Sequence, residues 1–197
     1  MDATPPGTRR FLVTGLAWFL IALLVGASGR LADLAPPRPQ LLLVGLTVLL
    51  VLAGATRAGF RTWLAALDLR LVLMLHLTRF VGIYFLVLSG RGVLPRAFAV
   101  PGGWGDIVAA SGALALLLLL RDPSRPPRWL LLWNLLGLAD ILFVVATAAR
   151  LARQDPGSMA ALLRLPLSLL PTFLVPLIIA SHLLVFWRLR RPPPSVA

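Results

Sequence analysis

Long hydrophobic runs are the feature that most constrains this chain, because six of them follow one another between residues 11 and 187. Each run holds 15 or more mainly apolar residues, and 59% of all residues are hydrophobic while only 13% are charged. A soluble domain of this size carries far more charge and does not gather its apolar residues in such blocks. The pattern therefore predicts an all-α fold, a polytopic transmembrane helix bundle with about six spans.

The predicted spans lie at residues 11–27, 41–55, 71–88, 104–120, 129–147 and about 166–187. Several are short for a hydrocarbon core of roughly 30 Å, so their ends must draw on neighbouring residues. We predict one membrane domain, residues 1–197, with short disordered ends at 1–8 and 191–197. The first run also has the features of a secretory signal, but a chain with five later spans needs no separate signal.

Arginine placement predicts the orientation, because cytoplasmic loops of membrane proteins carry an excess of positive charge. All 19 basic residues are Arg and all seven acidic residues are Asp, which gives a net charge of +12. With the N-terminus inside, the cytoplasmic segments hold eleven Arg residues and the outer segments seven. We therefore expect both termini in the cytoplasm and the chain in the inner (plasma) membrane. These Arg residues suit the anionic headgroups of a lipid bilayer, and they do not indicate a nucleic-acid partner.

Five polar side chains are predicted to lie inside the spans at comparable depths. His76 and Arg79 interrupt the third run, Asn134 and Asp140 the fifth, and His182 the sixth. A cation inside a bilayer costs roughly 2.5–3.5 kcal/mol on insertion scales, so it normally faces a partner or a water-filled cavity. Asp140 is the only acidic residue deep inside a predicted span, and we expect it to pair with Arg79. His76 and His182 are expected to face each other, because helical rise places both about 8 Å inside the cytoplasmic boundary.

Two further features concern the sixth and fourth spans. Pro171 and Pro176 lie in the sixth run, where each removes a backbone hydrogen bond, so we expect a kinked helix there. Asp106 follows the glycine-rich sequence PGGWG and is interpreted as an N-cap at the outer end of the fourth span. An alternative groups Asp106 with Arg91 and Arg96 in an outer-loop site, which would lie far from the histidine layer.

Three segments carry a resemblance to a known family: RGVLPRAFAVPGGWGDI at 91–107, WNLLGLADI at 133–141 and LPLSLLPTFLVPLIIASHLL at 165–184. On these segments the chain resembles a family of small bacterial multi-span proteins known only as uncharacterised membrane proteins. The resemblance runs from about Met74 to His182. It implies a membrane fold, and it brings no activity, ligand or catalytic residue with it.

The residues leave three classes of function open. The favoured one is a binding protein or carrier in which His76, Arg79, Asn134, Asp140 and His182 receive a small anionic or proton-coupled solute without a cofactor. A second is a structural or accessory membrane subunit whose polar residues only specify helix packing. A third is a b-type haem protein that uses His76 and His182 as iron ligands. An enzyme is less favoured, because no nucleophile motif is present and two His with one Asp barely meet a catalytic zinc site.

Overall fold

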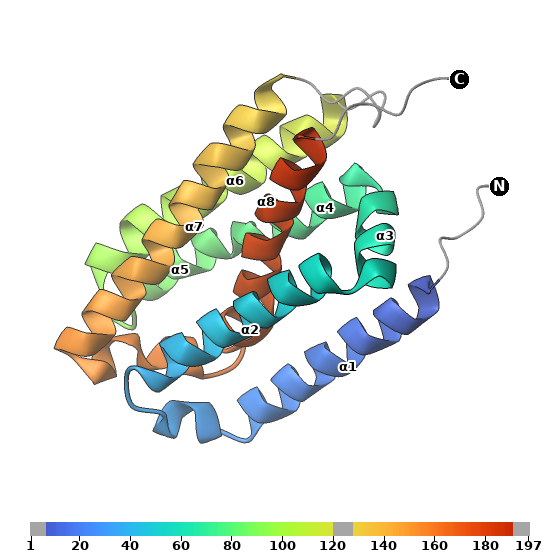
Figure 1. The fold of residues 1–197 in the computed structure, drawn as a ribbon. Coiled ribbons are helices and arrows are strands. Elements are labelled where there is room, and N and C mark those ends of the chain that lie inside the picture. Colours follow the sequence, from blue (N-terminus) through green and yellow to red (C-terminus); the bar gives the residue numbers. More distant parts are fainter. Residues whose placement is uncertain (1–6, 120–127, 191–197) are drawn as a thin grey trace, which may run out of the picture.

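The computed structural model describes residues 7–119 and 128–190, and over these ranges the chain is helical and has no β-strand. Figure 1 shows the helices arranged as a bundle. The α-helices are α1 (Thr8–Ala27), α2 (Arg38–Thr56), α3 (Ala58–Ala66), α4 (Leu69–Leu75), α5 (Val81–Gly90), α6 (Arg96–Leu119), α7 (Trp129–Gln154) and α8 (Val175–Leu189). Four short turns join or interrupt them: the 3₁₀ turns η1 (Arg30–Asp33), η2 (His76–Phe80) and η3 (Pro156–Leu163), and the π-helical turn η4 (Leu170–Leu174).

Six helical segments of the described chain are long and apolar enough to cross a membrane: Thr8–Ala27, Arg38–Thr56, Leu69–Gly90, Arg96–Leu119, Trp129–Gln154 and Leu170–Leu189. Each overlaps one predicted span, so the prediction of an all-α bundle with about six spans is confirmed. The start of α1 and the end of α8 lie at the same end of the bundle, beside α3 (Figure 1). An even number of crossings requires this arrangement.

The predicted boundaries need two corrections. The predicted disordered ends fall mostly on residues 1–6 and 191–197, which lie outside the described residues, but Thr8 is already the first residue of α1. The fourth span begins at Arg96 rather than at residue 104. The glycine-rich sequence PGGWG, expected to precede a helix capped by Asp106, lies inside α6 together with Asp106.

The third and sixth spans are not continuous α-helices. In the third, η2 separates α4 from α5 and carries both His76 and Arg79. In the sixth, η4 precedes α8, as the two prolines predicted. Pro176 lacks the N–H that would bond to the carbonyl of Thr172 in a regular helix. That carbonyl instead accepts a hydrogen bond of 2.9 Å from Trp18 Nε1 of α1, so the break is satisfied by a side chain.

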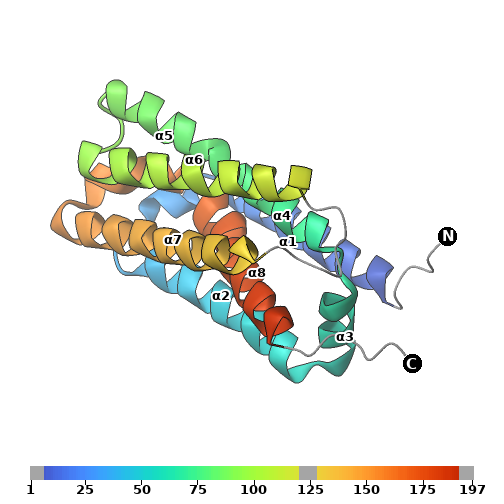
Figure 2. The same cartoon turned by 90° about the horizontal axis from the view of Figure 1, so that it is seen from above.

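Helix α6 lies at the centre of the packing, against α5 and α7 (Figure 2). Gly82 of α5 and Gly103 of α6 bring two backbones together, because a Cβ on Gly82 would overlap the Gly103 carbonyl. Hydrophobicity alone does not drive helices together in lipid, so close approach through small residues is the main source of packing there. The buried residues of α6 repeat at helical spacing: Phe98, Ala99, Gly102, Gly103, Asp106, Ala109, Ala110, Ala113 and Leu116.

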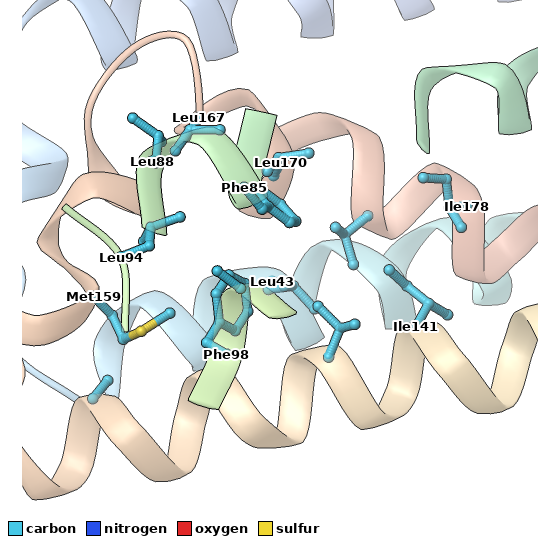
Figure 3. Close-up of a cluster of buried hydrophobic side chains, with 14 of the residues drawn as sticks. Leu43, Phe85, Leu88, Leu94, Phe98, Ile141, Met159, Leu167, Leu170 and Ile178 are labelled. Carbon is cyan, nitrogen blue, oxygen red and sulfur yellow. The ribbon is translucent and has the colours of Figure 1, made fainter. Parts of the chain in front are cut away.

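The two ends of the bundle differ, and we name them by their short elements. At the η3 end, a cluster of apolar side chains from α2, α5, α6, α7 and α8 forms the largest core, in which Phe85 and Phe98 are labelled near the middle (Figure 3). At the α3 end, the short helix α3 follows α2 and lies beside the end of α8 (Figure 1). Arg188 of α8 fixes it by donating hydrogen bonds to the carbonyls of Leu64 and Leu67.

Helix α1 is peripheral to this bundle. Of its residues only Ala22 and Gly26 are buried, and apolar side chains such as Leu24, 69% exposed, cover its surface. Acyl chains of a bilayer would cover these side chains, since a lipid-facing helix surface is apolar. The buried polar side chains lie instead in the part of the chain from α4 to α8.

Candidate functional site

The centre of the bundle is organised around Arg79, which is 1% exposed and lies at the middle of the third span. Its three guanidinium nitrogens point to three different acceptors. Nε donates to Oδ1 of Asp106 at 2.7 Å, and Nη1 donates to the carbonyl of Gly137 at 3.0 Å. Nη2 donates to Oδ2 of Asp140. The predicted ion pair between Arg79 and Asp140 is thus present, and it is half of a larger cluster.

Asp106 is the other half, and both predicted roles for it are wrong. It lies ten residues inside α6, where it is 3% exposed, so it neither caps a helix nor belongs to an outer loop. Arg91 and Arg96 do lie at the turn between α5 and α6, and both are exposed. The physical reason is that the glycines before Asp106 serve close helix packing instead of a turn. Helical spacing then directs Asp106 to the same face of α6 as Gly102 and Gly103, toward Arg79.

The cluster carries more negative than positive charge. One guanidinium faces two carboxylates, so the three side chains sum to a formal charge of −1 when both acids are ionised. The side chain of Asp106 is 4% exposed and that of Asp140 is 20% exposed. An uncompensated charge at this depth is costly, because the hydrocarbon core of a bilayer solvates ions poorly.

Two glycines of the neighbouring helices make room for the cluster. A Cβ on Gly105 of α6 would overlap the carboxylate of Asp140. A Cβ on Gly137 of α7 would lie 3.4 Å from Nη1 of Arg79 and 2.7 Å from Cε1 of His182. The cluster therefore depends on the absence of side chains at these two positions, and Gly137 is where it meets the histidines.

The histidine layer lies directly beside the arginine cluster. The rings of His76 and His182 have their centroids 4.4 Å apart, and both residues are fully buried. The prediction that they face each other is confirmed. Asn134 clamps His182 twice: its Oδ1 accepts from His182 Nδ1 at 2.8 Å and its Nδ2 donates to the His182 carbonyl at 3.1 Å. The ring of Trp133 closes the layer, 4.8 Å from that of His76 in an edge-on arrangement.

Two ring nitrogens of this layer have no hydrogen-bond partner. Ser181 Oγ donates to the carbonyl of Ile178 at 2.7 Å, so the contact of 2.9 Å between Ser181 Oγ and His76 Nε2 has the imidazole as donor. This leaves His76 Nδ1 as an unpartnered acceptor, and His182 Nε2 is unpartnered in the same way. Such orphan acceptors are rare in buried sites and often mark a place where a proton or ligand binds.

Two cavities approach this centre from opposite ends of the bundle. At the η3 end, a cavity of about 110 Å³ is lined mainly by apolar side chains and reaches Arg79 and Asp106. Several of its lining residues are labelled in Figure 3, namely Leu43, Phe85, Phe98, Ile141, Met159, Leu170 and Ile178. At the α3 end, a groove of about 560 Å³ lies among α2, α3, α4 and α8 and includes Ser181. The polar centre thus separates two spaces, one touching the cluster and the other touching the partner of His76.

The structure brings together every residue of the predicted central site, from η2, α7 and α8: His76, Arg79, Asn134, Asp140 and His182. Sequence reasoning missed Asp106 as a partner of Arg79, as well as Ser181 and Trp133. A signal for Asp106 existed, because small residues recur at helical spacing on both sides of it. No comparable signal marks Ser181, since an isolated serine in an apolar run is common.

The histidine pair does not fit the alternative of a b-type haem. Two axial histidines lie on opposite faces of a porphyrin, so its plane must pass between their rings. Here the ring centroids are 4.4 Å apart, and His76 Nε2 is engaged with Ser181. In residues 7–119 and 128–190, no group of three or more His, Cys, Asp or Glu side chains could hold a metal ion.

Six apolar crossings around a buried polar centre define an integral, multi-pass α-helical membrane protein. The chain belongs to the family described as Domain of unknown function (DUF8737), whose model matches residues 36–190. The match begins just before α2, so α1 lies outside it. No curated protein and no solved structure matches the chain.

Proposed function

We propose that this protein is a proton-coupled carrier for a small solute, with the Arg79 cluster and the histidine layer as its central site. It forms one membrane domain in a bacterial inner membrane, with both termini in the cytoplasm as the Arg distribution predicts. The site comprises the predicted residues His76, Arg79, Asn134, Asp140 and His182, to which we add Asp106.

The observation that carries this proposal is the pairing of one buried guanidinium with two carboxylates at the middle of the membrane. A purely structural ion pair needs one acid for one base. The second carboxylate adds a negative charge that only a proton or a cation can neutralise at this depth. Ionisable groups of this kind inside membrane bundles typically mark ion and proton pathways.

Between the two solutes predicted from the sequence, the geometry favours the proton-coupled one over the anionic one. An anion would change the formal charge of the cluster from −1 to −2, because Arg79 already faces two carboxylates. The unpartnered nitrogens of His76 and His182 are acceptors, which bind a proton rather than an anion.

Movement of a solute requires parts of the bundle that can rearrange, and two interruptions lie beside the site. The 3₁₀ turn η2 carries Arg79 and His76, and the π-helical turn η4 lies at the start of the sixth span. Such interruptions within helices often mark functional hinges. With one space on each side of the site, they support an alternating-access carrier.

A structural or accessory subunit is the second candidate. It is favoured by the three hydrogen bonds that Arg79 makes to two other helices, since such bonds between helices also fix their packing. Under this alternative, loss of the cluster would lower the stability of the protein, and the protein would move no protons in liposomes.

The test uses the purified full chain in liposomes that contain a trapped pH indicator. A panel of probes is added outside: benzenesulfonate, tetramethylammonium, glycine and glucose. We expect at least one to drive proton movement through the wild type and not through Asp106→Asn/Asp140→Asn. The matched control Asp33→Asn alters an exposed acid of η1 and should behave as wild type. If no probe moves protons, the carrier proposal fails.

A further inference from the structure

The cavity at the η3 end has an unusual combination of walls and base. Its walls are aliphatic and aromatic side chains from α2, α5, α7, η3 and α8, while its base is formed by Arg79 and Asp106. Any occupant must therefore place an apolar surface against the walls and a polar group against the cluster. This requirement restricts the chemistry of the solute.

Charge decides which polar group fits. Arg79 already faces the carboxylates of Asp106 and Asp140, so an anion would change the formal charge of the cluster from −1 to −2. A neutral group would leave the formal charge of −1 in place. The other titratable groups beside the cluster are His76 and His182, whose free nitrogens are acceptors. A single positive charge at the base of the cavity would neutralise the cluster.

Two features of the cavity wall favour a cation as well. Phe85 and Phe98 both line the cavity, with ring centroids 5.3 Å apart. Phe98 lies eight residues before Asp106 on α6, about 12 Å toward the η3 end, and aromatic faces attract organic cations. Gln40 also lines the cavity, and its Oε1 is buried without a partner. The approach to Asp106 thus presents π faces and an acceptor, and no cation precedes Arg79 among the described lining residues.

We propose that this cavity binds a small hydrophobic monocation of the ammonium class, in exchange for the proton that neutralises the Asp106 and Asp140 pair. This inference rests on the proposed function and names its substrate class. No covalent bond changes: the cation binds, one proton leaves, and the charge of the site is the same before and after. A cavity of roughly 150 Å³ holds benzene, so one of about 110 Å³ suits a smaller cation such as tetramethylammonium, which has fewer heavy atoms than benzene.

The test compares two molecules of nearly equal shape that differ in charge, tetramethylammonium and tert-butanol. Binding to the purified full chain is measured by equilibrium dialysis, and proton release by an indicator dye in weak buffer. We expect the cation to bind more tightly than its neutral isostere and to release a proton. Its affinity should rise with pH, approaching about tenfold per pH unit where the proton competes fully.

Two variants keep the proposal open to refutation. Asp106→Asn keeps the shape of the side chain and should weaken cation binding roughly tenfold or more, since charge-assisted contacts in a dry site are strong. Ala148→Phe fills the cavity from α7 without touching the charges and should abolish binding. Asp33→Asn should bind as wild type, and size-exclusion profiles confirm folding of each variant. Equal binding of the cation and its isostere, or wild-type binding by both variants, overturns the proposal.

Binding and proton movement together distinguish a wrong substrate class from a wrong carrier proposal. If benzenesulfonate or glycine drives protons through the liposomes while tetramethylammonium does not bind, the carrier stands and the substrate class is wrong. If the cation binds but no probe in the panel moves protons, the cavity is a binding site and the carrier proposal fails.

Discussion

Helices α1 and α6 both have the length and composition of membrane spans, but they occupy opposite roles. Helix α1 is the more apolar of the two and buries only two residues, whereas α6 buries nine, including Asp106. Hydrophobicity therefore does not determine which helix enters the centre of the bundle. Small residues and buried polar groups determine it, because lipid acyl chains solvate an apolar surface as well as another helix does.

The largest effect is expected from Arg79→Leu, which strands two carboxylates. Removal of one partner of a buried ion pair costs about 3–5 kcal/mol, and here neither acid retains a cation. Denaturant unfolding in detergent measures the loss. The matched change on the peripheral helix, exposed Arg9→Leu in α1, should leave stability almost unchanged.

Recovery of stability in variants that combine Arg79→Leu with changes of its partners distinguishes a three-residue cluster from a single ion pair. Adding Asp140→Leu alone leaves Asp106 stranded, so the double variant should recover only part of the loss. Adding Asp106→Leu as well removes the last charge and should recover most of it. Full recovery in the double variant would mean that Asp106 is not a partner of Arg79.

A smaller effect is expected from Leu116→Ala in α6. Leu116 is fully buried, and truncation of a buried leucine costs about 2–5 kcal/mol. Leu118 lies two residues further along the same helix and is 77% exposed, so Leu118→Ala should stay within about 0.5 kcal/mol. The same unfolding assay compares them. Equal losses would contradict the assignment of a buried and a lipid-facing side to α6.

Gly137→Ala tests the contact between the cluster and the histidine layer. Its new Cβ would lie 2.7 Å from the ring of His182, and overpacking of this kind costs about 1–3 kcal/mol. Gly45 of α2 has nothing within 4 Å of an added Cβ, so Gly45→Ala should be neutral or slightly stabilising through helix propensity. If Gly137→Ala is also neutral, His182 does not pack against α7 as described.

The smallest effect concerns the attachment of α1. Trp18→Phe keeps the ring but removes the hydrogen bond from Nε1 to the Thr172 carbonyl, for a loss of about 0.5–1.5 kcal/mol. Hydrogen exchange should become faster around η4, while the amides around Arg79 should be unaffected. Faster exchange at both places would mean that α1 belongs to the centre of the bundle.

The sequence was sufficient to predict the spans and most of the central site. A histidine or an aspartate inside an apolar run is conspicuous, and helical rise alone brings His76, Asn134 and His182 to one depth. Asp106 could not be placed correctly from the sequence, because two adjacent glycines such as Gly102 and Gly103 are typical both of a turn in a loop and of a close contact between two helices. Only the packing partner Gly82, more than 20 residues away in the chain, decides between them.

The cavities could not be predicted from the sequence either. The walls of the cavity at the η3 end combine residues from α2, η3, α7 and α8, and no local pattern records which of these apolar side chains leave space between them. The orphan nitrogens of His76 and His182 likewise depend on Ser181 and Asn134 as neighbours. Such features belong to the tertiary arrangement, so they appear only with the structure.

The central claim is that the second carboxylate gives the Arg79 cluster an exchangeable proton, and infrared spectroscopy of the purified chain at neutral pH tests it most directly. The account predicts a carbonyl-stretch band of a protonated carboxyl that shifts in heavy water and disappears in Asp106→Asn/Asp140→Asn while persisting in Asp33→Asn. Addition of tetramethylammonium should reduce the same band. Absence of any such band in the wild type would contradict the claim and leave the cluster as a structural element.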